Sequence, residues 1–221
     1  MKKLRAIILD IDGTLVDSND AHAQSYVDAG ESMGIIVQFQ DVRRLIGMGG
    51  DKLIPRVFGF EQESERGEEL DERKGEIFRD RFLPTLQPMP GARQLLERIR
   101  DEGLELVVAT SASESDLDGL LERAGVSDLI EKATSAGDVE ETKPAPDPVR
   151  SALEKVGCEP SEAVMVGDTP YDVEAANAAG VSIIGVRCGG WSTEELRGAA
   201  AVYQDPADLL QHYERSPLAR G

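Results

Sequence analysis

Four short apolar runs, each bounded by turn-forming residues, constrain the fold of this chain more than any other feature. They are Ala6–Leu9, Leu104–Ala109, Ala163–Val166 and Ser182–Val186. Runs of this length that are apolar at nearly every position are typical of strands buried on both faces, as in a parallel sheet. A weaker candidate strand surrounds Leu129 and Ile130. The chain therefore has the strands of a buried, mostly parallel sheet.

Helical patterns separate these strands in the second part of the chain. They cover Ala92–Arg100, Ser115–Ala124, Asp147–Val156 and Asp172–Ala179. Glycines 103, 125, 157 and 180 stand where these helices should end, as expected of glycine just after a helix. Strands that alternate with helices predict an α/β fold with a doubly wound, Rossmann-like parallel sheet.

The segment between the first strand and this block is helical in pattern and contains no convincing strand. Its helical stretches are Ala21–Met33, Asp41–Ile46 and the charged stretch Glu61–Phe82, whose charges predict a solvated face. Prolines 84, 88 and 90 mark its end. We predict an all-helical insertion at residues 18–84 between two parts of one core, residues 1–17 and 85–221.

Charge and cysteine content exclude several classes of partner. The formal net charge is −18 and no basic stretch offsets it, so nucleic acid and anionic membranes would be repelled. No apolar run approaches the length of a membrane span. Cys158 and Cys188 lie far apart without metal-ligand spacing and are expected to be reduced thiols. We expect a cytoplasmic protein, monomer or homodimer, with a small-molecule substrate.

Polar residues follow the strands at their carboxyl ends, where open α/β sheets bind ligands. The first strand is followed by Asp10 and Asp12, the second by Thr110 and Ser111, and the third by Asp168 and Asp172, with Lys143 in the segment before that third strand. Carboxylates, hydroxyls and one lysine are thus expected to meet at one edge of the sheet.

These residue types suit phosphoryl transfer. Mg²⁺ prefers oxygen ligands, and Asp10, Asp168 and the backbone carbonyl of Asp12 can supply them. The metal would draw a phosphate toward Asp10, whose carboxylate attacks phosphorus to form an aspartyl-phosphate. Asp12 would protonate the leaving oxygen and later deprotonate water. Because the whole chain is acidic, a phosphate site needs local positive charge, which the metal would provide.

The remaining polar residues of this edge would bind and orient. Lys143 and the hydroxyls of Thr110 and Ser111 would neutralise the phosphate oxygens. Strand phase favours Thr110 over Ser111, but both stay candidates. Asp172 is expected to orient Lys143 or the loop of Asp168.

The same residues resemble the signatures of the haloacid dehalogenase (HAD) superfamily. Residues 10–18, Asp-Ile-Asp-Gly-Thr-Leu-Val-Asp-Ser, are similar to its first motif, Lys143 in Thr-Lys-Pro to its third, and residues 167–172, Gly-Asp-Thr-Pro-Tyr-Asp, to its fourth. They occur in the order of the family. The resemblance implies a Mg²⁺-dependent phosphatase with a helical C1 cap, like phosphoglycolate phosphatase or β-phosphoglucomutase. A Ser-Ala-Ser match to the mutases favours Ser111 as the hydroxyl of the second motif.

Residues of the insertion are candidates for contact with the substrate. His22 matches a position at which several C1-capped relatives carry histidine, and it is either a proton shuttle or a hinge histidine. Residues 47–52 form a glycine-rich turn without the spacing of a nucleotide P-loop. Gly47 would let the backbone approach the substrate, and Lys52, Arg43 or Arg44 would then meet a substrate anion.

Three alternatives to a phosphatase remain open. A β-phosphoglucomutase-like phosphosugar mutase shares the core, but such mutases carry an arginine near residues 47–50, where this chain has glycines. A dehalogenase uses the same nucleophile on carbon, but such relatives generally lack the second aspartate, here Asp12. A phospho-accepting signalling module would place its acceptor after a middle strand and would have no inserted cap.

Overall fold

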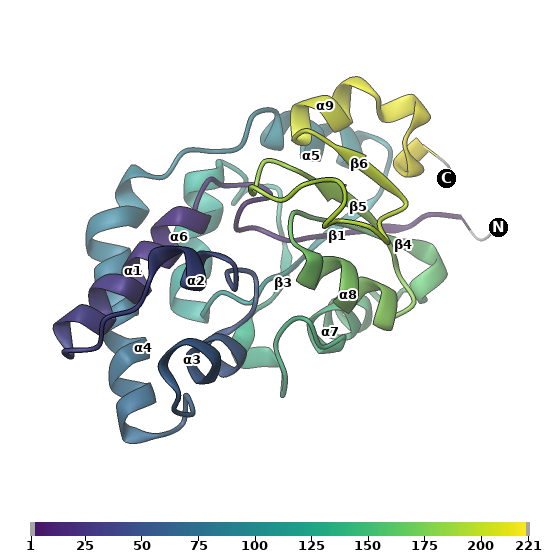
Figure 1. Cartoon of the computed structure of the whole chain (residues 1–221). Helices are drawn as coiled ribbons and strands as arrows, with labels where there is room; N and C mark the ends of the chain where they lie inside the picture. The colour runs from purple at the N-terminus through teal and green to yellow at the C-terminus, as the bar shows by residue number, and fades with distance from the viewer. Residues whose placement is uncertain (1–2, 220–221) are drawn as a thin grey trace.

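A computed structural model describes residues 3–219 of the chain and shows one parallel sheet with a helical insertion at its side (Figure 1). Within these residues the sheet has six strands in the order β3-β2-β1-β4-β5-β6, and every pair is parallel. The strands are β1 (Ala6–Leu9), β2 (Glu105–Ala109), β3 (Lys132–Thr134), β4 (Ala163–Gly167), β5 (Ser182–Val186) and β6 (Ala201–Tyr203). The predicted α/β fold class is confirmed.

Helices cover both faces of the sheet, which explains why the central strand is apolar throughout. The helices of the core are α5 (Ala92–Asp101), α6 (Glu114–Ala124), α7 (Asp147–Val156), α8 (Pro170–Ala178) and α9 (Pro206–Gln211). Ile7 and Leu9 of β1 pack in the cluster that includes α5, α6 and α9, whereas Ile8 packs in the cluster of α7 and α8. All three side chains are fully buried. Hence alternate residues of β1 serve two separate cores.

The two edge strands were the least predictable part of the sheet. The expected strand around Leu129 and Ile130 is wrong, because β3 begins at Lys132. Leu129 is buried by packing in the turn after α6, so its apolar character reflects the core and not a strand. The strand β6 was not predicted, since its three half-exposed residues form no apolar run. Short edge strands carry little hydrophobic signal.

The insertion consists of helices and follows β1 directly, as predicted. Its elements are α1 (Asn19–Ser32), α2 (Phe39–Arg43), α3 (Gly50–Phe58), α4 (Glu65–Ile77), a π-helical turn η1 (Phe78–Phe82) and a 3₁₀ turn η2 (Leu83–Thr85). It has its own apolar cluster, which includes Tyr26, Ile54 and Leu70. The exact boundaries at residues 18 and 84 stay a prediction.

Several helix starts differ from the prediction, and two of these differences concern residues near the candidate site. The glycine-rich segment at residues 47–52 is not a turn throughout, because α3 begins at Gly50 after the extended Gly49. Helix α8 begins at Pro170 and not at Asp172, since the Thr169 hydroxyl and the Asp172 carboxylate cap each other's backbone amides. No helix in residues 3–219 is long and apolar enough to cross a membrane.

The burial of Ile8 in the central strand β1 predicts how its substitution changes stability. We expect Ile8→Ala to lower the free energy of unfolding by about 2–5 kcal/mol, because it leaves a cavity in the centre of the sheet. The matched change Ile8→Val removes one methyl group and should cost about 0.5–1.5 kcal/mol. Urea unfolding of both variants measures these values. Equal losses for the two variants would contradict the central position assigned to Ile8.

Candidate active site

The carboxyl end of β1 places two aspartates at the edge of the sheet. The amide of Asp10 donates to the carbonyl of Val166 at 3.0 Å, so Asp10 continues the pairing of β1 with β4. The chain then turns at Gly13, which has φ +75°. A side chain on Gly13 would collide with the carboxylate of Asp168 and the amide of Asn19. Glycine therefore permits the close approach of β1's turn to the loop after β4.

Lys143 joins this edge from the segment before α7. Its ammonium donates to Asp10 Oδ1 at 2.5 Å and to Asp172 Oδ1 at 2.7 Å. The Lys143 side chain is only 1% exposed, and its position between two carboxylates is typical of a buried charge that is fully paired. Burial by itself would lower the pKa of Lys143, but Asp10 and Asp172 outweigh it and raise that pKa. Lys143 is thus a fixed positive charge beside Asp10.

A cluster of carboxylates around Asp168 fits a divalent cation. Oxygen atoms of Asp10, Asp168 and Asp172 lie within 4.8 Å of one another, and all three residues are buried. If all three carboxyl groups are ionised, the single ammonium of Lys143 leaves two negative charges in this cluster. Buried, uncompensated charge is costly, and oxygen ligands are those that Mg²⁺ prefers. The donor set and its charge therefore suit Mg²⁺.

Burial and neighbouring negative charges raise the pKa values of Asp10 and Asp168. Desolvation, together with the neighbouring Asp172 and Asp12, raises the pKa of Asp10 to about 7, although Lys143 works against this rise. Desolvation, Asp10 and Asp172 raise the pKa of Asp168 well above its usual value. A bound cation would favour the charged form of both carboxyl groups.

Asp12 has different partners. Its Oδ1 lies 2.8 Å from His22 Nε2 and accepts from the Ser18 hydroxyl at 2.5 Å. Although burial opposes the effect, His22 and Ser18 lower the pKa of Asp12. The Asp12 carboxylate thus lies outside the carboxylate cluster, and its backbone carbonyl accepts no backbone hydrogen bond from the described residues. That carbonyl is free to serve as a metal ligand.

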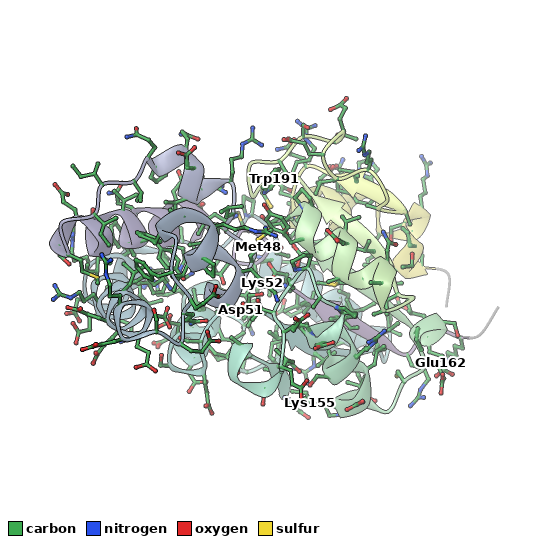
Figure 2. The ribbon with its side chains drawn as sticks, turned by 60° about the horizontal axis from the view of Figure 1, so that its bottom comes forward. Met48, Asp51, Lys52, Lys155, Glu162 and Trp191 are labelled. Atoms are coloured by element: carbon green, nitrogen blue, oxygen red, sulfur yellow. The ribbon has the colours of Figure 1, made fainter. Side chains whose placement is uncertain are left out.

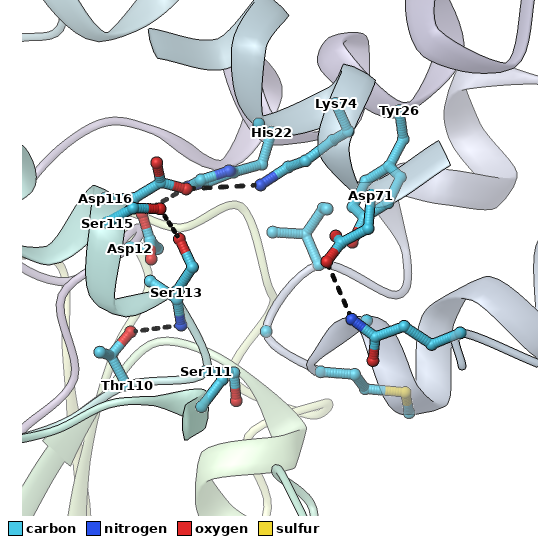
Figure 3. A pocket seen from close by; sticks show the side chains of 18 of the residues that line it. Asp12, His22, Tyr26, Asp71, Lys74, Thr110, Ser111, Ser113, Ser115 and Asp116 are labelled. Atoms are coloured by element: carbon cyan, nitrogen blue, oxygen red, sulfur yellow. Dashed lines mark hydrogen bonds and ion pairs between the residues drawn. The ribbon is translucent and has the colours of Figure 1, made fainter. Parts of the chain in front are cut away.

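The predicted hydroxyls line a cavity of about 410 Å³, to which Asp10 also contributes (Figure 3). Thr110 Oγ1 accepts from the backbone amide of Ala112 at 3.0 Å. The buried Oγ of Ser111 has no hydrogen-bond partner among the described residues. Both residues line the cavity together with Asp10, Asp12 and the histidine at position 22. An anion in the cavity could accept hydrogen bonds from either hydroxyl.

The basic candidates of the insertion lie elsewhere. Lys52 pairs with Glu141 at 3.2 Å, and Figure 2 shows it with Asp51 at the boundary between insertion and core. Arg44 pairs with Glu195 at 2.6 Å, and Arg43 donates to the carbonyl of Gly189 at 2.6 Å. None of the three basic residues lines the cavity, whereas Gly47 does. In this closed arrangement they tie the insertion to the core.

Sequence reasoning missed three residues that hold the acidic groups in place. Thr14 Oγ1 donates to Asp168 at 3.0 Å and lies 3.3 Å from Asp10 Oδ2, while Ser18 binds Asp12. Asn19, the first residue of α1, donates to Asp168 Oδ2 at 2.9 Å. Their place within or directly after the first motif was the available signal. Without coordinates nothing indicated which carboxylate each would reach.

Comparisons with known proteins identify the family of this chain. A model of the haloacid dehalogenase-like hydrolase family matches residues 7–186. A phosphoglycolate phosphatase of Rhodospirillum rubrum is 33% identical over 219 residues, which cover 93% of this chain and 89% of the relative. A hydrolase of Pseudomonas syringae has a solved structure with TM-score 0.88 and 29% identity, covering 96% of this chain and 98% of the other. The β-phosphoglucomutase of Clostridium difficile, with TM-score 0.85, covers 98% of this chain and 97% of its own, but at 20% identity it shares the fold alone.

The raised pKa values predict that cation binding depends on pH. A cation binds the ionised carboxylates, so binding must release protons where the pKa of metal-free Asp10 is about 7. We therefore expect Mg²⁺ affinity to rise from about pH 5 to about pH 8. Calorimetric titrations in two buffers of different ionisation enthalpy measure the proton release.

The control is Asp101→Asn, which removes one exposed carboxylate at the end of α5. It should leave the pH dependence unchanged. Mg²⁺ binding without proton release over this pH range would contradict the raised pKa values.

Proposed function

The chain belongs to the haloacid dehalogenase-like hydrolases, and we propose that it is a cytoplasmic, Mg²⁺-dependent phosphatase of a small phosphorylated metabolite. The observation that carries this proposal is the ion pair of Asp10 with Lys143 at the base of a cavity lined by Asp12 and two hydroxyls. Asp10 is the proposed nucleophile. We expect the enzyme to act as a monomer or homodimer.

The proposed reaction has two steps on Asp10. A carboxylate oxygen of Asp10 attacks phosphorus, and the bond from phosphorus to the ester oxygen breaks as that oxygen takes, through Asp12, the proton that Asp12 shares with His22. Asp12 then takes a proton from water, which attacks the phosphorus of the aspartyl-phosphate and releases inorganic phosphate. Mg²⁺, held by Asp10, Asp168 and the Asp12 carbonyl, would neutralise negative charge on the phosphoryl group. The carboxylates are restored at the end.

The other residues bind and position. The ammonium of Lys143 neutralises charge on the phosphoryl oxygens, and the hydroxyls of Thr110 and Ser111 donate hydrogen bonds to them. Asp172 accepts from the amide and hydroxyl of Thr169 and from Lys143, so it holds the lysine against β4's loop. In this role Asp172 supports the site and leaves the metal to the other carboxylates.

His22 connects Asp12 to the insertion. Its ring lies flat against Phe78 with centroids 4.0 Å apart, which fixes the ring while Nε2 meets Asp12. We propose that His22 holds Asp12 and relays its proton during leaving-group protonation. Because His22 belongs to α1, the insertion itself holds Asp12 in this position.

A phosphosugar mutase is the second candidate, since the fold is shared with β-phosphoglucomutase. Such an enzyme must keep water from the aspartyl-phosphate and pass the phosphoryl group to a sugar hydroxyl. The glycines at 47, 49 and 50 replace the arginine that such mutases carry near these positions. This departure favours hydrolysis.

Phosphate release from a metabolite panel tests the proposed function. We expect Mg²⁺-dependent release by the natural chain and a fall of at least about 10³-fold in Asp10→Asn, which keeps the shape of the side chain but not the nucleophile. The exposed variant Asp101→Asn is the control. Undiminished release by Asp10→Asn would overturn the assignment.

The same assay on a hexose 1-phosphate separates the two candidate functions. Free inorganic phosphate identifies a hydrolase, whereas a hexose 6-phosphate identifies a mutase.

A further inference from the structure

The cavity has an acidic wall on the side of the insertion. Glu68, Asp71 and Glu72 line it from α4. Positions three and four residues apart lie on one face of a helix, so these carboxylates share the face that looks into the cavity. The charged stretch predicted to be a solvated surface thus also forms part of the site.

The two cationic side chains that line the cavity already form ion pairs within the protein. Lys74 and Arg79 both line it, and both approach the buried Asp116, at 3.8 Å and 3.0 Å. Lys74 also lies close enough to Asp12 to lower the pKa of that carboxyl. Two cations therefore face two carboxylates, Asp116 and Asp12. The described residues that line the cavity carry six carboxyl groups against these two paired cations, so a second anion of the substrate would meet net negative charge.

Asp71 and Tyr26 lie together on this wall, across the cavity from Thr110 and Ser111 (Figure 3). Asp71 Oδ2 accepts from Gln62 Nε2 at 3.0 Å, and no ion pair to Asp71 occurs in the described part of the chain. Tyr26 is only 6% exposed, yet its hydroxyl has no hydrogen-bond partner in residues 3–219. The fully buried, unpartnered atoms of residues 3–219 do not include this oxygen, so the hydroxyl is open to the cavity, where a ligand atom can bond to it.

The Tyr26 hydroxyl stays protonated. Burial and the carboxylates of Asp71, Asp116 and Asp51 raise its pKa well above the ordinary value. The side of the cavity across from Thr110 and Ser111 therefore offers a carboxylate acceptor beside a neutral hydroxyl. Such a pair binds groups that donate hydrogen bonds, and it repels a carboxylate or a second phosphate.

We propose that the leaving group of the substrate ends in a hydrogen-bond donor, a hydroxyl or an ammonium, and not in a second anion. This inference rests on the proposed phosphatase function and names its substrate class: phosphate monoesters of small polyols or amino alcohols. A cavity of about 410 Å³ has room for a phosphate and a short leaving group. The substrate of this chain would then differ from that of the relatives named phosphoglycolate phosphatase, because phosphoglycolate carries a carboxylate.

Three esters of equal length test the proposal on the unaltered chain. Phosphoglycolate, 2-hydroxyethyl phosphate and phosphoethanolamine differ at the far end by carboxylate, hydroxyl and ammonium. At saturating Mg²⁺ we expect kcat/KM for the hydroxyl and ammonium esters to exceed that for phosphoglycolate by at least about tenfold. The better of these two esters tells which donor the wall prefers.

Two variants assign the preference to the wall. Asp71→Asn removes the charge and should raise kcat/KM for phosphoglycolate about tenfold while lowering it for phosphoethanolamine. Tyr26→Phe removes one hydrogen bond and should lower kcat/KM for 2-hydroxyethyl phosphate about threefold to tenfold. The control Glu76→Gln makes the same charge change on α4 at an exposed residue outside the cavity lining, and it should leave all three values unchanged.

The outcomes distinguish a failure of the inferred substrate class from a failure of the proposed phosphatase function. A preference of the natural chain for phosphoglycolate, or ratios that Asp71→Asn leaves unchanged, would overturn the inference. Hydrolysis of p-nitrophenyl phosphate in the same experiment would show that the phosphatase function still holds. If p-nitrophenyl phosphate and all three esters stay intact, the proposed function fails together with the inference.

Discussion

The buried ion pair between Lys143 and Asp10 is the interaction on which the site depends. It joins the end of β1 to the segment before α7, and Asp172 at the start of α8 completes it. Each of these charges would be very costly to bury alone, so the sheet and the loops must bring them together as pairs. The parallel order of β1 and β4 does this by ending both strands at one edge.

The helical insertion shares residues with this charged centre and does not merely lie over it. Asn19 starts α1 and holds Asp168, and His22 one turn later holds Asp12. On the opposite side Asp51 accepts a hydrogen bond from the hydroxyl of Thr142, the residue before Lys143. The insertion thus contacts Asp168, Asp12 and the neighbour of Lys143 at once, while its helix α4 lines the cavity beside them.

The sequence predicted the buried centre better than its surroundings. β1 and β5 are apolar at nearly every position because both faces are covered, so their bounds were predictable, and the motifs at the strand ends stood out. β3 and β6 are short and half exposed, so neither strand gave a hydrophobic period, and the glycines before Asp51 hid the start of α3. The pairing of Arg44 with Glu195 joins positions 151 residues apart, and no local pattern reveals such a contact.

Direct capture of the phosphorylated carboxylate tests the central claim. An aspartyl-phosphate is an acyl phosphate, which borohydride reduces to homoserine, so quenching the enzyme during turnover and reducing it should convert the residue at position 10. We predict homoserine at position 10 in peptides from the natural chain and none when substrate is omitted. An unreduced Asp10, or homoserine at another aspartate, in enzyme quenched during turnover would contradict the account.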